Sequence, residues 1–165
     1  LGGFDTAYWP GEDTKLCLDI KRLGLKIVYE PEAVVYHHRR PLFTEHLRQV
    51  SRYAFQRGFF VKAFPETSLK PGYFAPSVFF FFICSGPMLP VISLKAAFVW
   101  AVIFSIYMVF LLAASIMAML ANKSVIVGAL TVPGVFLTHI VYGYNFVKGL
   151  LSSRKGMIAL DVQRV

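Results

Sequence analysis

The feature that most constrains this chain is an apolar run of 26 residues without any charge, AAFVWAVIFSIYMVFLLAASIMAMLA, at positions 96–121. A helix of about 20 apolar residues is long enough to cross the hydrocarbon core of a bilayer. A buried helix of a soluble domain is the alternative interpretation, but 26 uncharged residues are many for a chain of only 165 residues. The run therefore predicts a transmembrane helix.

Two further uncharged segments flank this run, at 73–94 and 124–147. The later segment contains one proline and predicts a second crossing helix. The earlier segment contains Pro76, Pro87 and Pro90, which interrupt a helix because proline lacks the amide N–H. This segment is compatible either with a kinked crossing helix or with a re-entrant hairpin.

Charge is distributed unevenly along the chain, whose formal net charge is +8. Of the 17 lysines and arginines, 11 lie in residues 1–70, together with 8 of the 9 acidic residues. The chain thus divides near Pro71 into a polar part and a membrane part. The stretch LGGFDTAYWP has no initiator methionine and no signal-peptide pattern, so we expect a piece of a longer domain. We predict four regions: a truncated catalytic part (1–40), an amphipathic interfacial helix and linker (41–70), a transmembrane region (71–151) and a tail (152–165).

The polar part shows first a helical and then an alternating pattern. Leu16, Ile20 and Leu23 recur at helical spacing, with Asp13 suited to cap the start of this helix and Gly24 suited to follow its end. LKIVYE (25–30) and AVVYHH (33–38) then read as two short strands, and helical spacing returns after Pro41. Helix, strand, strand and helix in this order predict the C-terminal end of an α/β domain.

The segments GGFD (2–5) and GEDTKLCLDIKRLGLKIVYEPEAVVYH (11–37) together resemble the C-terminal half of the catalytic domain in family 2 glycosyltransferases of the GT-A fold. The resemblance covers residues 1 to about 58 and implies an α/β nucleotide-diphospho-sugar transferase domain. It implies that Asp13 is the general base and Glu12 its partner, and that Gly3, Phe4 and Asp5 belong to the loop beneath the acceptor.

This role for Asp13 is chemically reasonable, because an inverting displacement needs one carboxylate within hydrogen-bond reach of the acceptor hydroxyl. A helix N-terminus also favours the ionised form of a nearby carboxylate. The alternative is purely structural: Asp13 caps the helix and Glu12 complements the positive end of the helix dipole.

A second motif lies in the helical stretch after Pro41. Gln49, Arg52 and Tyr53 match the QxxR[WY] pattern of membrane-embedded family members such as cellulose and hyaluronan synthases. The resemblance implies an interfacial helix that closes the active site and contacts sugar or diphosphate. Helical spacing places these residues on one face, beside an apolar stripe that can rest on the membrane: Phe43, Leu47, Val50 and Ala54. A basic helix that lies on anionic lipid through Arg48, Arg57 and Lys62 is the alternative.

Two histidines suggest further roles. Some enzymes of the GT-A fold use a late histidine to complete a divalent-cation site (Mg²⁺ or Mn²⁺), which would make His37 a metal ligand. The Asp-x-Asp metal motif is missing from this sequence, so we expect most of the metal site upstream of Leu1 and an inactive fragment. In THIVYGYNFVKGL, a series that resembles exopolysaccharide-type and succinoglycan-type members, His139 is either functional or bonded to a neighbouring helix.

These observations together predict a membrane-anchored glycosyltransferase that moves a sugar from a nucleotide-sugar donor to a lipid-linked or polysaccharide acceptor, without a nucleic-acid partner. A transport or channel fragment with a cytosolic cap is the alternative. We expect a multi-pass protein of the cell (inner or plasma) membrane whose catalytic part faces the cytosol. The distribution of Lys and Arg favours a re-entrant 73–94, an external Lys123 and a cytosolic C-terminus.

Overall fold

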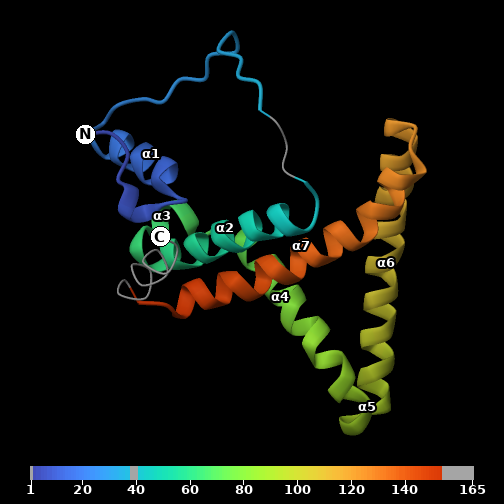
Figure 1. Cartoon of the computed structure of the whole chain (residues 1–165). Coiled ribbons are helices and arrows are strands. Elements are labelled where there is room, and N and C mark those ends of the chain that lie inside the picture. Colours follow the sequence, from blue (N-terminus) through green and yellow to red (C-terminus); the bar gives the residue numbers. More distant parts are fainter. Residues whose placement is uncertain (1, 38–40, 154–165) are drawn as a thin grey trace.

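A computed structural model describes residues 2–37 and 41–153 of the chain. Across these residues the secondary structure is helical, and no strand is formed. The elements, shown in Figure 1, are η1 (Thr6–Tyr8), α1 (Glu12–Arg22), α2 (Thr44–Ala63), α3 (Pro65–Ser68), α4 (Pro71–Ser85), η2 (Gly86–Met88), α5 (Leu89–Ile92), α6 (Leu94–Asn122) and α7 (Val125–Leu151).

The expected α/β domain of the GT-A type is therefore wrong for the described part of the chain, which is all-α. The two predicted strands lie in an extended segment that loops away from the helices (Figure 1). Their apolar side chains are open to solvent, as Val28 at 81% and Tyr36 at 95% exposure show. An alternating pattern makes a strand only where a neighbouring strand pairs with it, and two short strands alone are marginal in water. His38 lies outside the described residues.

Helix α1 begins at Glu12, one residue before Asp13, which was the predicted N-cap residue. Gly11 occupies the N-cap position without a side-chain hydrogen bond, and Asp13 lies in the first turn. The predicted end is confirmed, since Gly24 follows the helix with a φ of +74°. Lys15 and Asp19, four residues apart, form a partly buried ion pair along this helix.

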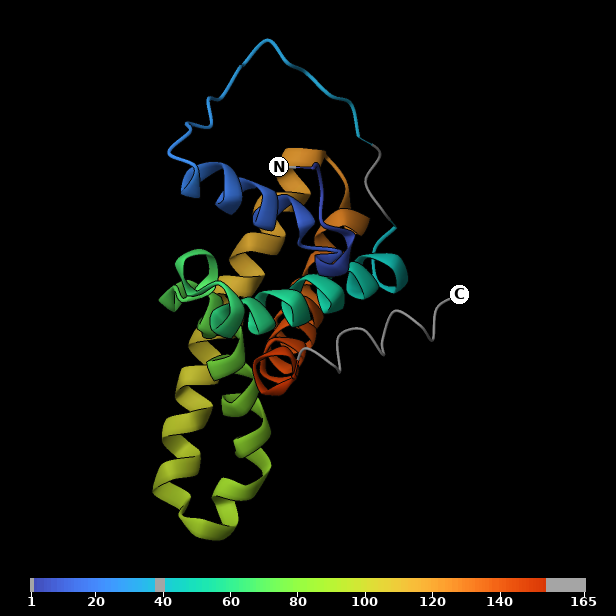
Figure 2. The same ribbon diagram turned by 90° about the vertical axis from the view of Figure 1, so that its left-hand side faces the viewer.

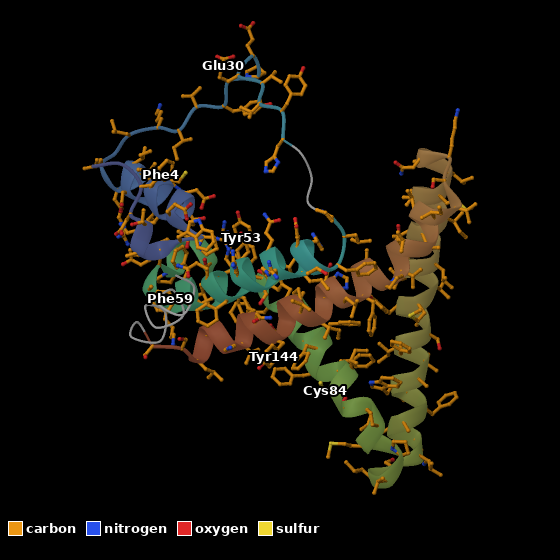
Figure 3. All side chains as sticks on the ribbon, in the orientation of Figure 1. Phe4, Glu30, Tyr53, Phe59, Cys84 and Tyr144 are labelled. Atoms are coloured by element: carbon orange, nitrogen blue, oxygen red, sulfur yellow. The ribbon has the colours of Figure 1, made fainter. Side chains whose placement is uncertain are left out.

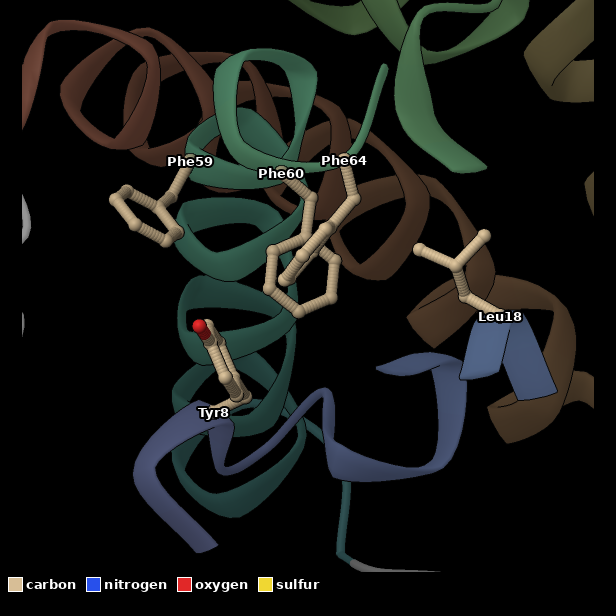
Figure 4. Packing of buried hydrophobic residues seen from close by; sticks show 5 residues of the cluster. All are labelled: Tyr8, Leu18, Phe59, Phe60 and Phe64. Atoms are coloured by element: carbon tan, nitrogen blue, oxygen red, sulfur yellow. The ribbon is translucent and has the colours of Figure 1, made fainter. Parts of the chain in front are cut away.

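Helix α2 packs on its two sides against different parts of the chain. One side meets the N-terminal segment in an aromatic cluster, where Phe60 is 1% exposed and lies edge-to-face against Phe64 and Tyr8 at ring-centroid distances of 5.0 and 5.9 Å. Phe59 and Leu18 complete this cluster (Figure 4). Because Tyr8 and Leu18 flank residues 9–17, the cluster fixes the turn before α1 on the surface of α2.

The other side of α2 packs against α7. A Cβ atom added at Gly149 would lie 2.7 Å from the carbonyl carbon of Phe55, and one added at Gly58 would lie 2.9 Å from Leu150 N. Only glycine permits this approach of two backbones. Ala54, which belongs to the stripe expected on the membrane, is fully buried. At that position the stripe is covered by protein rather than by lipid.

Three helical segments are long and apolar enough to cross a membrane: Pro71–Ile92, Leu94–Asn122 and Val125–Leu151. The first runs through α4, η2 and α5, and the chain reverses only before α6 (Figures 1 and 2). The helix is interrupted after Ser85, as the prolines predicted, but the expected hairpin within 73–94 is not formed. Trp100 Nε1 of α6 donates to Phe82 O of α4 at 2.7 Å and ties the two helices together.

Helix α7 crosses α6 obliquely and returns to α2 and α4 (Figure 1). Ser115 Oγ donates to Gly128 O at 2.6 Å where α6 and α7 meet. Further along α7, Ser77 Oγ of α4 donates to Gly143 O at 3.1 Å. These hydroxyl–carbonyl bonds bridge neighbouring helices, as is common between membrane helices.

Candidate active site

The loop of residues 2–5 lies at the exposed edge of the molecule. Gly2 and Gly3 have positive φ values of 73° and 89°. Phe4 is 61% exposed, and it is labelled beside α1 in Figure 3. The Asp5 carboxylate accepts from Ala7 N at 3.1 Å and caps η1. None of the three predicted acceptor-loop residues (Gly3, Phe4, Asp5) lines the cleft that contains Asp13.

The turn before α1 is pressed onto α2. A Cβ atom at Gly11 would lie 2.8 Å from Gln56 Cγ and 3.0 Å from the ring of Phe60, so a larger residue here would displace these side chains. The guanidinium of Arg52 lies 5.1 Å from the centre of the Trp9 ring, a cation–π contact. These contacts hold the start of α1 in place.

Asp13 projects from this first turn into a cleft of about 330 Å³ between α1, α2 and the start of α4. Its Oδ1 accepts from Thr14 N at 2.6 Å. Three cationic side chains and one tyrosine share the cleft with it, namely Lys21, Arg57, Lys70 and Tyr73. A carboxylate beside several cations is an arrangement that can bind an anionic donor and accept a proton from a second substrate.

The alternative interpretation of α2 gave Arg57 to lipid headgroups, but the structure places it in the cleft of Asp13. Its guanidinium lies 4.8 Å from the centre of the Tyr73 ring, and its Nη1 donates to Ser68 Oγ at 3.4 Å. The sequence of α2 carries no signal for this position, because Ser68 and Tyr73, which contact Arg57, lie outside that helix.

One ion pair closes the cleft at its edge. Arg22 Nη2 of α1 donates to Glu66 Oε1 of α3 at 2.8 Å. The Arg22 hydrogen bond lowers the pKa of the Glu66 carboxyl below its ordinary value of 4.5. Both side chains are more than half exposed, so the pair contributes little to stability.

Gln49 and Arg52 lie in a different pocket, of about 220 Å³, together with Glu45 and Arg48. Tyr53 is 44% exposed and is not part of that lining (Figure 3). The structure thus brings two of the three motif residues together, but not into the cleft of Asp13. Arg48, which the lipid-binding alternative gave to headgroups, shares their pocket.

Glu12 lies beside Asp13 but is placed differently. Its Oε2 is buried and has no hydrogen-bond partner among the described residues, and the same holds for Nε2 of Gln56, which is 3% exposed. Gln56 packs on the turn that precedes Glu12. Both groups therefore retain hydrogen-bonding capacity at the start of α1. Gln56 follows Arg52 by four residues and so lies on the same side of α2, but sequence reasoning gave it no role.

The described residues alone do not supply a complete ligand set for a divalent cation. His37 is exposed in the extended segment, and no group of three His, Cys, Asp or Glu side chains that could hold a metal occurs in the described ranges. His139 Nδ1 lies 3.1 Å from the hydroxyl of Tyr107 on α6. This matches the alternative in which His139 bonds to a neighbouring helix.

Comparison with known families decides the class of protein. The family model described as "Glycosyl transferase family group 2" matches residues 1–141. The chain belongs to this family. The match extends the resemblance from the polar part through α6 and most of α7. No curated protein and no solved structure matches the chain.

As a member of this family, the protein is an enzyme that acts on a nucleotide-sugar donor and an acceptor. Its three long apolar helices fit a membrane protein. The family match gives the alternative of a transport or channel fragment no support. The family match does not distinguish exopolysaccharide-type members from other members of the family.

Proposed function

We propose that this glycosyl transferase moves a sugar, with inversion at the anomeric carbon, from a nucleotide-sugar donor to a lipid-linked or polysaccharide acceptor. The observation that carries the proposal is Asp13 at the start of α1, in a cleft that also contains Lys21, Arg57 and Lys70. The proposal includes the exopolysaccharide type and a position at the cytosolic face of the cell membrane, where nucleotide sugars occur.

In the proposed reaction, Asp13 acts on the acceptor and the cationic side chains act on the leaving group of the donor. Asp13 removes the proton from the acceptor hydroxyl while that oxygen attacks the anomeric carbon. The bond between this carbon and the diphosphate oxygen breaks, and the nucleoside diphosphate leaves with the bonding electron pair. The cations at Lys21, Arg57 and Lys70 stabilise the negative charge on the leaving group.

Other predicted site residues receive supporting roles in this proposal. Glu12 orients the turn before α1 or contacts the acceptor through its buried carboxylate oxygen. Gln49 and Arg52 bind a polar substrate group in their own pocket. No step is routed through a metal, because the described residues provide no ligand set for one.

The decisive experiment is Asp13→Asn in the complete protein, measured by sugar transfer and by donor binding. Transfer should be lost while the dissociation constant of the donor stays nearly unchanged, because a general base acts in the transition state. Asp19→Asn is the matched control, since Asp19 lies on the same helix and pairs with Lys15 outside the cleft. Wild-type turnover in Asp13→Asn would remove Asp13 from the mechanism.

A further inference from the structure

The cleft of Asp13 is connected directly to the first long apolar segment. Two of the residues that line it lie at the start of α4, Lys70 as the N-cap residue and Tyr73 in the first turn. Pro71, between them, is also the first residue of Pro71–Ile92, which is long and apolar enough to cross a membrane. Figure 2 shows α1 and α3 at one end of α4 and α5 at the other. The cleft therefore lies at one end of a helical segment of membrane-crossing length.

The length of this segment decides how close the cleft is to the lipid. Its 22 residues extend over about 33 Å as a helix, whereas the hydrocarbon core of a bilayer is about 30 Å thick. Any tilt of the helix shortens its reach across the bilayer further. Almost no length is left over, so a crossing places Tyr73 at the boundary of the hydrocarbon core. Tyrosine and lysine are also residue types that anchor helices at this boundary.

The same geometry sets the level at which Asp13 acts. Asp13 lines the same cleft as Tyr73, so its carboxylate lies within one cleft width of the boundary of the hydrocarbon core. The polar head groups of the lipids occupy about 5–8 Å on each side of that core. A hydroxyl on a lipid head group is held at this level, whereas the end of a water-soluble polysaccharide has to be brought to it. Confinement to this layer raises the effective concentration of acceptor that the base meets.

The size of the cleft limits the head group that can enter. Its volume of about 330 Å³ must also hold the charged part of the donor beside Lys21 and Arg57. The guanidinium of Arg57 lies 4.8 Å from the centre of the Tyr73 ring, so the cationic part of the cleft adjoins the membrane side directly. A head group that extends from the boundary to Asp13 therefore spans no more than the width of the cleft. A longer one would have to fold back.

We propose that the acceptor is a membrane lipid with a short, hydroxyl-bearing head group, which enters the cleft of Asp13 on the side of Lys70 and Tyr73. The hydrocarbon part stays in the bilayer beside α4, the head group contacts the Tyr73 ring, and its hydroxyl reaches Asp13. This inference rests on the proposed function and deepens it, because it selects a lipid-linked acceptor over a polysaccharide. It also assigns acceptor binding to Tyr73.

The level of the cleft is measured by fluorescence quenching in the complete protein, reconstituted in phosphatidylcholine nanodiscs. Cys17 lines the cleft and is exposed, so it carries a bimane label in a variant that keeps Cys17 as its one thiol. Phosphatidylcholine with a nitroxide on the head group should quench this label severalfold more strongly than phosphatidylcholine with a nitroxide in the middle of the acyl chain. Glu30→Cys is the control, because Glu30 is exposed in the extended segment on the side away from α5 (Figures 1 and 3). Equal quenching at the two positions would overturn the proposal.

The acceptor is tested with washed native membranes as its source and a panel of tritiated nucleotide sugars as donors. With the wild-type protein, the label should first appear in material that chloroform and methanol extract. Label that appears first in a water-soluble polymer would overturn the proposal.

Tyr73→Ala tests the contact with the head group. It should raise the amount of membrane needed for half-maximal transfer about tenfold, because a contact with an aromatic ring is lost. The dissociation constant of the donor should change far less, since Arg57 keeps its hydrogen bond to Ser68, and Tyr73→Phe should behave as the wild type. Tyr144→Ala is the control, because Tyr144 is 52% exposed on α7 and does not line the cleft. An equal requirement for membrane in Tyr73→Ala and Tyr144→Ala would remove Tyr73 from acceptor binding.

The quenching measurement needs neither donor nor turnover, so it is independent of the role of Asp13. Loss of transfer in Asp13→Asn together with equal quenching at Cys17 and Glu30→Cys would keep the base and refute the lipid acceptor. Quenching of Cys17 by the head-group nitroxide together with wild-type turnover in Asp13→Asn would keep the cleft at the membrane surface and remove the proposed base.

Discussion

The packing of α2 on α7 predicts a large effect from a single methyl group, in Gly149→Ala. The added Cβ atom would lie 2.7 Å from the carbonyl carbon of Phe55, whereas ordinary van der Waals contact begins at 3.4 Å. The obstacle is backbone, so no side-chain rotation can relieve it. The two helices must therefore separate locally by more than the difference between these two distances, because the carbonyl oxygen of Phe55 lies closer still.

Overpacking of a close contact costs about 1–3 kcal/mol, and a backbone obstacle places this variant near the upper end. Alanine in place of glycine gains about 1 kcal/mol from helix propensity. The net loss is about 2 kcal/mol, which lowers the melting temperature of a chain of this size by about 4–8 °C. Thermal unfolding in detergent micelles, followed by tryptophan fluorescence, measures it.

Gly72→Ala is the matched control. Gly72 also lies in a helix, the first turn of α4, but an added Cβ atom there meets no atom within 4 Å. Its melting temperature should equal or exceed that of the wild type. If Gly149→Ala has the same melting temperature as the control, the close approach of α2 and α7 does not exist in the protein.

Two further substitutions concern the cleft of Asp13. Arg57→Ala should raise the dissociation constant of the nucleotide-sugar donor about tenfold or more, because hydrogen bonds to charged groups contribute about 1.5–3 kcal/mol. Arg48→Ala, in the other pocket, should leave this dissociation constant unchanged. Glu66→Gln should reduce the loss of thermal stability between pH 7 and pH 3. The lowered pKa of Glu66 means that its pair with Arg22 stabilises the fold above pH 4.5 and is lost as the pH falls through the folded-state value.

Features that depend on neighbouring residues in the sequence were predictable. Gly24 ends α1 as its position suggested, and the prolines after Ser85 interrupt the first apolar helix. The lengths of the apolar helices also follow from composition alone. Helix ends and apolar runs are set locally, by backbone conformation and by the solvent that surrounds each segment.

Features that depend on distant partners were missed. The pattern of residues 25–37 is that of strands, but pairing requires a neighbour that the described residues do not supply. Arg57 was read as lipid-facing because nothing in α2 alone reveals that Ser68 and Tyr73 lie beside it. The close approaches of Gly58 to Phe146 and of Gly149 to Phe55 likewise have no local signal.

The same packing constrains how the chain lies in a membrane. Helix α2 lies along α7 from Leu42, which contacts Gly134, to Lys62, whose Nζ donates to Ser152 O at 2.6 Å. Charged side chains occur along the whole of α2, at Glu45, Arg48, Arg52, Arg57 and Lys62. Such a helix lies at the water–lipid interface, and packed helices are about 8–10 Å apart. We therefore place residues 134–151 of α7 at the interface as well.

The remaining part of α7, residues 125–133, spans about 14 Å as a helix and cannot cross a hydrocarbon core of about 30 Å. Two crossings then remain, made by α4 with α5 and by α6. This arrangement predicts Lys123 on the same side as Asp13, whereas the distribution of Lys and Arg favoured an external Lys123. Among the described lysines and arginines, this arrangement places Lys95 alone on the opposite side, in keeping with the tendency of Lys and Arg to stay on the cytosolic side.

Cysteine labelling tests this topology directly. Lys123→Cys and Met88→Cys are compared after Cys17→Ser and Cys84→Ala remove the native thiols, and Met88 serves as the reference because it lies at the turn between α4 and α5 and is 65% exposed. A membrane-impermeant maleimide should label Met88→Cys in intact cells and Lys123→Cys only in inverted vesicles. Labelling of Lys123→Cys from outside the cell would mean that α7 crosses the bilayer. Helix α2 could then not remain packed along α7, because the charged side chains of α2 would enter the hydrocarbon core.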